Sequence, residues 1–230
     1  VSSRNVLGNL RASNVRVIWD KAPSTPHLIK EVLNPSMNPY EDFLVEVANV
    51  CEGNETKKPE VAYVADLIKL SIARDPSDLD YMKYLVDIMI KGKALNNDYE
   101  VLKRAKIAKF LLRRLLRLIS ERSLEVSGVK VVTLDLPESR IYAGLLGIAA
   151  TEFSRMNRTD VILIRKEESK IVVTARSLTD RAYKICQVLS SKLKGRFGGH
   201  AEAASTTLPD MPLSEAVKLI IEVARGIFKG

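Results

Sequence analysis

The sequence predicts an α/β protein in which two parts are joined by one long helix. Three observations indicate this class. The first hundred residues carry several helical patterns and a single strand pattern, the stretch from Asp98 to about Ser123 contains no glycine or proline, and strand and helix patterns alternate after Gly128. With 230 residues, 46% of them hydrophobic, the chain can bury a substantial core. We therefore divide it into residues 1–97, 98–125 and 126–230.

The first part contains one predicted strand and four predicted helical segments. The strand is the β-branched and aromatic run at residues 15–19. A helical turn over 27–33 ends before Asn34-Pro35, and longer helices cover 39–50, 59–73 and 79–91. Asp78 is the expected N-cap of the last helix, so Asp78-Leu79-Asp80 is interpreted as a cap and not as a pair of metal ligands. A lone strand cannot form a sheet, so it pairs elsewhere or is a remnant.

The long helix concentrates the positive charge of the chain. Residues 103–122 hold eight basic residues and one acidic residue, which accounts for seven of the eight net positive charges. Wound at about 100° per residue, the apolar and basic side chains fall on opposite halves. The basic half is either a solvated face or a surface for phosphates or for an acidic partner protein, and a membrane-surface helix is disfavoured because no second anchor accompanies it. Its residues are Lys103, Lys106, Lys109, Arg113, Arg114 and Arg117.

The last part reads as β-α-β-β-α-loop-β-α, which predicts a mixed sheet with helices on one or both faces. The expected strands are 129–134, 160–165 and 171–175, with a short extended piece through Leu208-Pro209. The expected helices are 140–156, one capped by Thr179 or Asp180 that runs to Leu193, and 214–228. Gly144 and Gly147 in the first of these helices permit close packing.

Two stretches of this part are candidates for a binding site. Arg176-Ser177 ends a strand ahead of a helix N-terminus, where a guanidinium, a hydroxyl and free N–H groups suit an anion. The glycine loop at 195–205 adds further N–H groups and an imidazole. The alternative is that the preceding helix ends with Gly195 as its C-cap and the rest is a turn. The candidate binding residues are Arg176, Ser177, Arg196, Phe197, Gly198, Gly199 and His200.

The remaining reactive residues argue against metal and disulfide chemistry. Cys51 and Cys186 are too few for a disulfide framework or a zinc site, which fits a reducing compartment. His27 and His200 are the only histidines, so a two-metal site cannot be assembled, and we expect no metal and no cofactor. No apolar run reaches the roughly 18 residues that cross a bilayer, and no signal-peptide pattern begins the sequence. A cytoplasmic protein with no membrane partner is expected.

The candidate binding stretches resemble the C-terminal domain of the DHH phosphoesterases, which include the RecJ single-strand exonucleases. The likeness rests on the residues from Val173 to Ser177, followed by a helix and then by Gly198-Gly199-His200-Ala201-Glu202-Ala203-Ala204. That family pairs an Arg-Ser strand end with a Gly-Gly-Gly-His loop. Phe197 stands here for the first glycine and Ser205 for the glycine after the alanines. The resemblance covers residues 126–230 and implies nucleic-acid binding by the candidate residues, with Phe197 available for base stacking.

The N-terminal part resembles a truncated and degenerate DHH domain over residues 1–97. Trp19-Asp20-Lys21 stands where the family has Asp-His-His after a strand. The resemblance therefore implies a non-enzymatic, single-stranded-DNA-binding scaffold subunit. Shortened archaeal RecJ-like proteins of this kind are counterparts of the cell-division-cycle subunit of the replicative helicase, so it also implies the GINS complex and the MCM helicase as partners and association with the nucleoid. The alternative is an active phosphodiesterase or exonuclease on oligonucleotides, with metal ligands that are unrecognised or lie on another chain.

Overall fold

The computed structural model describes residues 20–228, so the strand expected at 15–19 lies outside the described residues. The chain forms two compact units, Val1–Asp66 and Leu67–Gly230. The predicted division after residues 97 and 125 therefore stays a prediction.

The described part of the first unit is helical. Helices α2 (Thr25–Leu33) and α3 (Pro39–Cys51) confirm the helices predicted there, and α4 (Pro59–Ala73) begins in the same unit. Ser24 caps α2 and its hydroxyl donates to the side chain of Asn49 at 2.6 Å. The side-chain nitrogen Nδ2 of Asn49 lies 3.2 Å from Nδ1 of His27, so this histidine links α2 to α3. Asp20 lies exposed ahead of α2.

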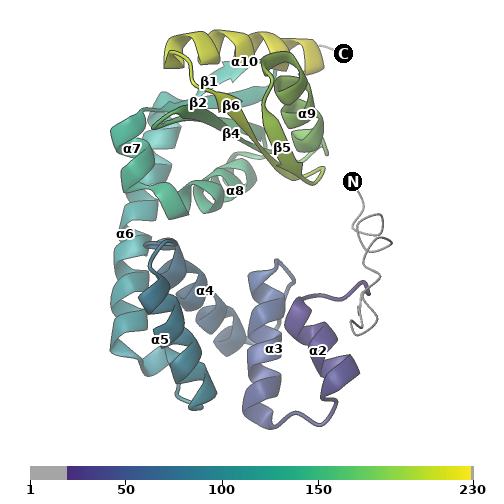
Figure 1. Ribbon diagram of the computed structural model, residues 1–230, viewed down its shortest axis with the longest axis vertical. Coiled ribbons are helices and arrows are strands. Elements are labelled where there is room, and N and C mark those ends of the chain that lie inside the picture. Colours follow the sequence, from purple (N-terminus) through teal and green to yellow (C-terminus); the bar gives the residue numbers. More distant parts are fainter. Residues whose placement is uncertain (1–19, 229–230) are drawn as a thin grey trace. The chain divides into compact units, whose positions relative to one another are not determined.

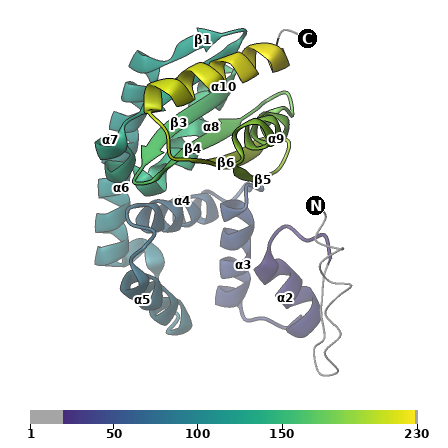
Figure 2. The same cartoon turned by 45° about the horizontal axis from the view of Figure 1, so that its top comes forward.

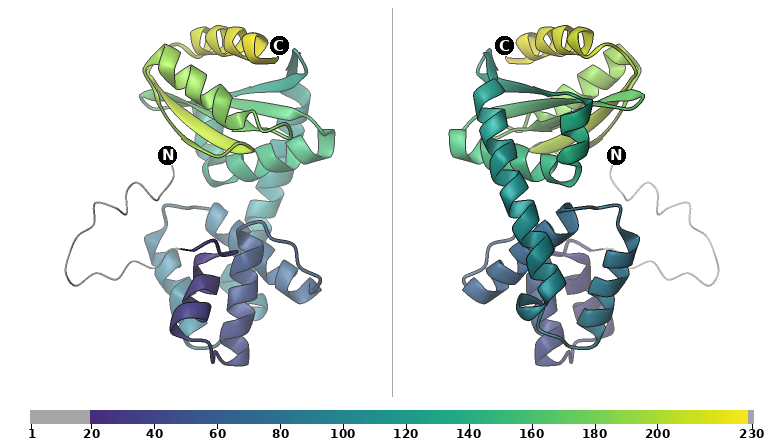
Figure 3. Two further views of the ribbon diagram at one scale, coloured as in Figure 1. Left: turned by 90° about the vertical axis from the view of Figure 1, so that its right-hand side faces the viewer. Right: turned by 90° about the vertical axis from the view of Figure 1, so that its left-hand side faces the viewer.

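The second unit begins with a helical layer that ends in the long basic helix. It contains the end of α4, helix α5 (Leu79–Ile90), the short η1 (Leu95–Asn97) and α6 (Tyr99–Arg122), which is one uninterrupted helix (Figure 3). Asp78 accepts a hydrogen bond from the amide of Tyr81 at 2.9 Å, which confirms it as a cap. Asp98 caps α6 in the same way. The buried face of α6 repeats at helical spacing, as predicted, through Val101, Ala105, Ala108, Leu112, Leu115 and Ile119.

A six-stranded mixed sheet forms the rest of this unit (Figure 1). The strand order is β1-β2-β3-β4-β6-β5, and only β2 and β3 are parallel. Their crossover consists of α7 (Leu136–Ile141), η2 (Ala143–Leu145) and α8 (Leu146–Asn157). The strands are β1 (Leu124–Val126), β2 (Val129–Leu134), β3 (Asp160–Glu167), β4 (Lys170–Arg176), β5 (Arg196–Gly199) and β6 (Ala203–Pro209).

Helices cover both faces of the sheet (Figure 2). Helices α9 (Ala182–Leu193) and α10 (Leu213–Phe228) pack on the face that carries Ile162 and Ile164. Helices α6 and α8 pack on the opposite face, which carries Val161 and Leu163. The first five residues of β3 are buried, because alternate side chains enter two separate cores. The predicted α/β class with a mixed sheet is confirmed.

Two predictions about local structure in this unit are wrong. The expected loop at 195–205 is mostly strand: β5 pairs antiparallel with β6, and only a short turn separates them. The helix expected over 140–156 is split into α7, η2 and α8, and β1 was not predicted. Both strands that were missed are short edge strands, which gain their structure from pairing and not from a local apolar pattern.

The ends of α9 also differ from the prediction. The N-cap is Arg181, without a side-chain hydrogen bond, so neither Thr179 nor Asp180 caps the helix. At the other end the left-handed C-cap is Lys194, with φ of 54°, and not Gly195. Gly195 is needed for space, since a Cβ there would lie 2.5 Å from the carbonyl oxygen of Thr207.

Candidate nucleic-acid interface

Arg176 ends β4, and its guanidinium has no carboxylate partner in the described part of the chain. Its Nε donates to the hydroxyl of Thr151 at 2.9 Å, and Nη1 donates to the carbonyl of Ala175 at 2.9 Å. Nη2 lies above Gly147, where a Cβ would approach it to 3.3 Å. Burial lowers the pKa of this guanidinium, and no carboxylate among residues 20–228 counteracts that effect. Because arginine stays charged in proteins, the site holds a half-buried, uncompensated positive charge.

Ser177 is buried, and its hydroxyl is used inside the protein. The hydroxyl donates to Oδ2 of Asp160 at 2.8 Å and accepts hydrogen bonds from the amides of Thr179 and Arg181. Asp160, itself buried at the start of β3, also accepts from the hydroxyl of Thr179 and from the amide of Leu178, both at 2.7 Å. We expected the Ser177 hydroxyl to bind an anion. In the structure it instead holds the turn that follows Arg176.

The β5–β6 hairpin is held beside Arg176 by its turn. The amide of His200 donates to the carbonyl of Ala203 at 2.7 Å, which closes the turn. The carbonyls of Ala201 and Glu202 accept hydrogen bonds from the amides of Ala182 and Ser177. Residue 176 also pairs with residue 203 in the sheet. The two motifs that the sequence singled out therefore lie together, whereas the amides of residues 181 and 182 at the α9 N-terminus are already bonded.

The outer strand of the hairpin is exposed along its whole length. Since β5 is an edge strand, every second residue directs its N–H and C=O away from β6. Phe197 is 36% exposed, and its ring meets the edge of Tyr183 with centroids 5.2 Å apart. Gly199 has φ of 135°, and a Cβ there would lie 2.4 Å from the carbonyl of Ala203, whereas Gly198 faces open space. Arg196 and His200 are also exposed.

A cavity of about 360 Å³ opens at the Arg176 end of the sheet. Sequence reasoning missed Thr151 and Arg155, which lie four residues apart on α8, and the carboxylates of Asp180 and Glu202. The only sequence signal for the α8 pair is its helical spacing. The lining residues are Thr151, Ser154, Arg155, Arg176, Ser177, Leu178, Asp180, Glu202 and Ala203.

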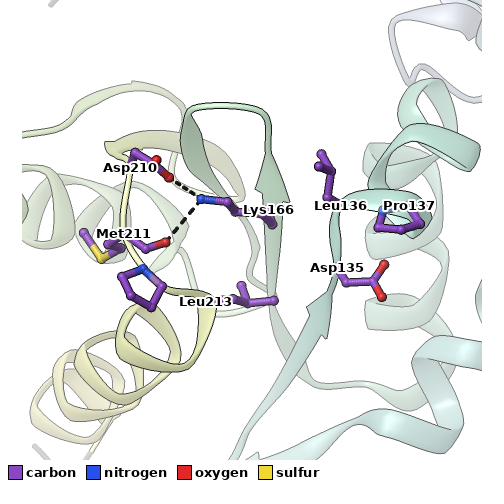
Figure 4. A pocket seen from close by; sticks show the side chains of 8 residues that line it. Asp135, Leu136, Pro137, Lys166, Asp210, Met211 and Leu213 are labelled. Atoms are coloured by element: carbon purple, nitrogen blue, oxygen red, sulfur yellow. Dashed lines mark hydrogen bonds and ion pairs between the residues drawn. The ribbon is translucent and has the colours of Figure 1, made fainter.

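A second cavity, of about 660 Å³, lies at the opposite end of the sheet (Figure 4). Lys166 of β3 forms an ion pair there with Asp210 and donates to the carbonyl of Met211 at 3.3 Å. Asp135 caps α7 on the other side of the cavity. The walls are mainly apolar and include Leu136, Pro137, Met211, Pro212 and Leu213.

The structure also bears on metal and membrane chemistry. Among residues 20–228, no three histidine, cysteine, aspartate or glutamate side chains gather as a set of metal ligands. None of the helices in the described part combines the length and the apolar character needed to cross a membrane. Cys186 is fully buried and burial raises the pKa of its thiol to about 12, so this thiol is neutral at ordinary pH.

Residues 128–230 match the model of the DHHA1 domain. No curated protein matches the sequence. Among solved structures, the chain is similar to the pGpG-specific phosphodiesterase PggH from Vibrio cholerae, with a TM-score of 0.58 and 16% identity over 88% of this chain and 74% of that one.

Two further structures share the fold. The DHH domain of PF0399, a member of the s1p family of ribosomal proteins, has a TM-score of 0.57 at 18% identity. RecJ from Thermus thermophilus in complex with Mg²⁺ has a TM-score of 0.56 at 22% identity. Each match covers 88% of this chain, which spans 54% and 31% of those two chains, respectively. The fold of this chain is therefore similar to that of the PF0399 DHH domain and of RecJ.

Proposed function

We propose that the DHHA1 domain of this chain binds single-stranded nucleic acid, with a phosphodiester group at Arg176. The half-buried guanidinium that lacks a carboxylate partner carries this proposal. Burying an uncompensated cation costs free energy, and an incoming phosphate removes that cost while accepting charge-assisted hydrogen bonds. Arg155, which lines the same cavity, adds a second cation for the phosphates.

The rest of the site suits the sugar and base of a nucleotide. The carboxylates of Asp180 and Glu202 line the cavity and are exposed. They accept hydrogen bonds from base amino groups or from a terminal sugar hydroxyl, whereas they repel additional phosphates. The exposed ring of Phe197 and the imidazole of His200 on the neighbouring hairpin provide faces on which bases stack.

In this proposal the chain is a non-catalytic scaffold subunit of the DNA replication machinery, acting with the GINS complex and the MCM helicase. The resemblance to degenerate RecJ-like proteins supports this role. Affinity capture of the tagged chain from its source cell is expected to recover GINS and MCM subunits after nuclease treatment. Capture that contains neither complex contradicts the replication role and leaves the binding site to be judged separately.

Binding at Arg176 is tested by fluorescence anisotropy with a labelled single-stranded oligonucleotide. Arg176→Gln is expected to weaken binding about 10- to 100-fold, because hydrogen bonds to charged groups contribute about 1.5–3 kcal/mol. The matched control is Arg140→Gln, which removes the same charge from an exposed residue paired with Glu168. Equal affinity of the two variants contradicts the proposed site.

The second candidate function is a phosphodiesterase. It is favoured by the fold shared with PggH, of which this chain spans 74%. Incubation with pGpG and with end-labelled oligonucleotides in Mn²⁺ decides between the two functions. The scaffold proposal expects no nucleotide release. Manganese-dependent release that disappears in Asp20→Asn establishes the enzyme and overturns the non-catalytic role.

A further inference from the structure

The middle of α6 carries a row of exposed cations that form no ion pair with any acidic side chain of the described residues. We define its outer stripe as Lys106, Lys109, Phe110, Arg113, Arg114 and Arg117, all of which are exposed. We propose that this stripe is a second nucleic-acid surface, which follows the phosphodiester backbone of a single strand. The proposal extends the proposed function to another surface and does not depend on the Arg176 cavity.

Cations at the two ends of the same helix form ion pairs with acidic side chains. Lys103 lies 3.4 Å from Glu100, and Arg104 pairs with Asp78 at 2.8 Å. At the other end, Arg122 pairs with Glu138. No cation of the outer stripe has such an ion pair among residues 20–228. The missing neutralisation is therefore confined to the middle of the helix.

Leaving these charges unpaired is unfavourable for the helix. Lys109, Arg113 and Arg117 follow one another at i,i+4 spacing, where like charges destabilise a helix by a few tenths of a kcal/mol per pair. The buried face of α6, which contributes Leu115 and Ile119 to the core, maintains the helix regardless. An extended anion on the stripe removes the repulsion.

The shape of the stripe fits a linear polyanion. Residues 106 to 117 span about 16 Å of helix at 1.5 Å per residue, and the cations follow the helix axis. In the right-hand view of Figure 3, α6 faces the viewer as one straight element. A row of this form matches successive phosphates better than the single charge of a small ligand.

An exposed aromatic ring in the middle of the row favours nucleic acid over an acidic protein. Phe110 is 59% exposed, and the guanidinium of Arg114 lies 5.8 Å from the centre of its ring. Alternation of cations with an exposed aromatic ring is typical of surfaces that bind single strands, since bases stack on the ring while cations hold the backbone. The neighbouring Ile107 is 38% exposed, so the apolar area is too small for insertion into a membrane.

The charge of the stripe is tested in the full chain with a fluorescein-labelled oligothymidylate. The triple variant Lys106→Gln, Arg113→Gln, Arg117→Gln is expected to weaken binding about 10- to 100-fold at 0.1 M salt. It should also flatten the plot of log K against log salt by about 2, because three phosphate contacts are lost. The matched control removes three exposed cations from α9 and α10 through Lys192→Gln, Lys218→Gln and Arg225→Gln. Equal effects of the two triple variants mean that only net charge matters, which overturns the proposal.

The aromatic ring is tested separately. Phe110→Ala is expected to weaken binding about tenfold without changing the salt slope, and Phe110→Trp is expected to restore it. Circular dichroism verifies that each variant remains folded. If the stripe variants lose affinity for polyglutamate or phosphatidylserine vesicles but keep their affinity for the oligonucleotide, the stripe serves another partner and the proposal is wrong. Failure of Arg176→Gln alone affects only the proposed function, because the stripe variants are scored independently.

Discussion

The two ends of the C-terminal sheet each carry a cation beside a cavity, but only one of these cations is neutralised. At the end where β3 finishes, Lys166 pairs with Asp210 and bonds to the carbonyl of Met211 (Figure 4). At the end where β3 begins, Arg176 donates to a hydroxyl and a carbonyl, its only hydrogen-bond partners within residues 20–228. The lysine therefore fastens the β6–α10 connection, whereas the arginine has no carboxylate partner among residues 20–228.

Asp160 lies near Arg176 but forms its hydrogen bonds with other groups. Asp160 is close to this end of the sheet, but it is 5% exposed and occupied by two hydroxyl groups and one amide. Hydroxyl and amide donors thus satisfy the carboxylate of Asp160 at this end, whereas Lys166 satisfies that of Asp210 at the other end. The buried acid at this end therefore satisfies other donors and forms no ion pair with Arg176.

The largest expected effect comes from Asp160→Ala. It leaves the hydroxyl groups of Ser177 and Thr179 and the amide of Leu178 without their acceptor, so we expect the free energy of unfolding to fall by about 3 kcal/mol. The measurement is urea denaturation followed by circular dichroism. The counterpart Asp210→Ala breaks a partly exposed ion pair and is expected to cost about 0.5–1 kcal/mol. If both variants lower the free energy of unfolding equally, Asp160 and Asp210 contribute alike to stability, and the proposed difference between the two ends of the sheet is wrong.

The same hydrogen bonds show what the sequence could not predict. Two helix starts followed from local signals, Asp78 at the N-cap of α5 and proline at the start of α4, whereas the ends of α9 did not. The burial of Ser177 depends on Asp160, which lies 17 residues away in sequence and meets it only through the pairing of β3 with β4. No local pattern records that pairing. The sequence therefore predicted which residues meet at this end of the sheet but not which of their polar groups are already hydrogen-bonded, and binding at this end stays a prediction.

The glycine motif gives a second example. Its composition predicted a loop, because two glycines favour turns, whereas the structure makes them the end of β5. Pairing with β6 outweighs the local preference, and Gly199 is required there since its backbone has a positive φ and approaches Ala203 closely. The motif lies next to the strand end at Arg176, as expected, but its conformation depends on the neighbouring strand, and its role in binding stays a prediction.

A smaller effect is expected when each cation is replaced by methionine. Arg176→Met removes a desolvated charge that no acid compensates, so we expect the free energy of unfolding to change by no more than about 0.5 kcal/mol. Lys166→Met leaves Asp210 without its partner and is expected to lower the free energy of unfolding by about 0.5–1 kcal/mol. Thermal and urea denaturation of both variants provide the comparison. A clear loss of stability in Arg176→Met alone means that the arginine serves the fold and not a ligand.

The smallest expected effect concerns Cys186 near Arg176, because burial and the charge of Arg176 act in opposite directions on the pKa of its thiol. Burial raises the pKa to about 12, although the charge of Arg176 acts to lower it. The native thiol should therefore resist Ellman's reagent at pH 8 and react after unfolding.

The same pKa shift makes the stability of the fold depend on pH. Because the pKa of Cys186 in the folded state exceeds that in the unfolded state, its contribution to stability is fully present below pH 9 and disappears as the pH rises towards 12. The stability of the wild type relative to Cys186→Val should be constant below pH 9 and decline above it. Rapid labelling of the native thiol at pH 8 means that the unpaired charge of Arg176 outweighs burial, and a ligand anion would then be expected to slow the labelling.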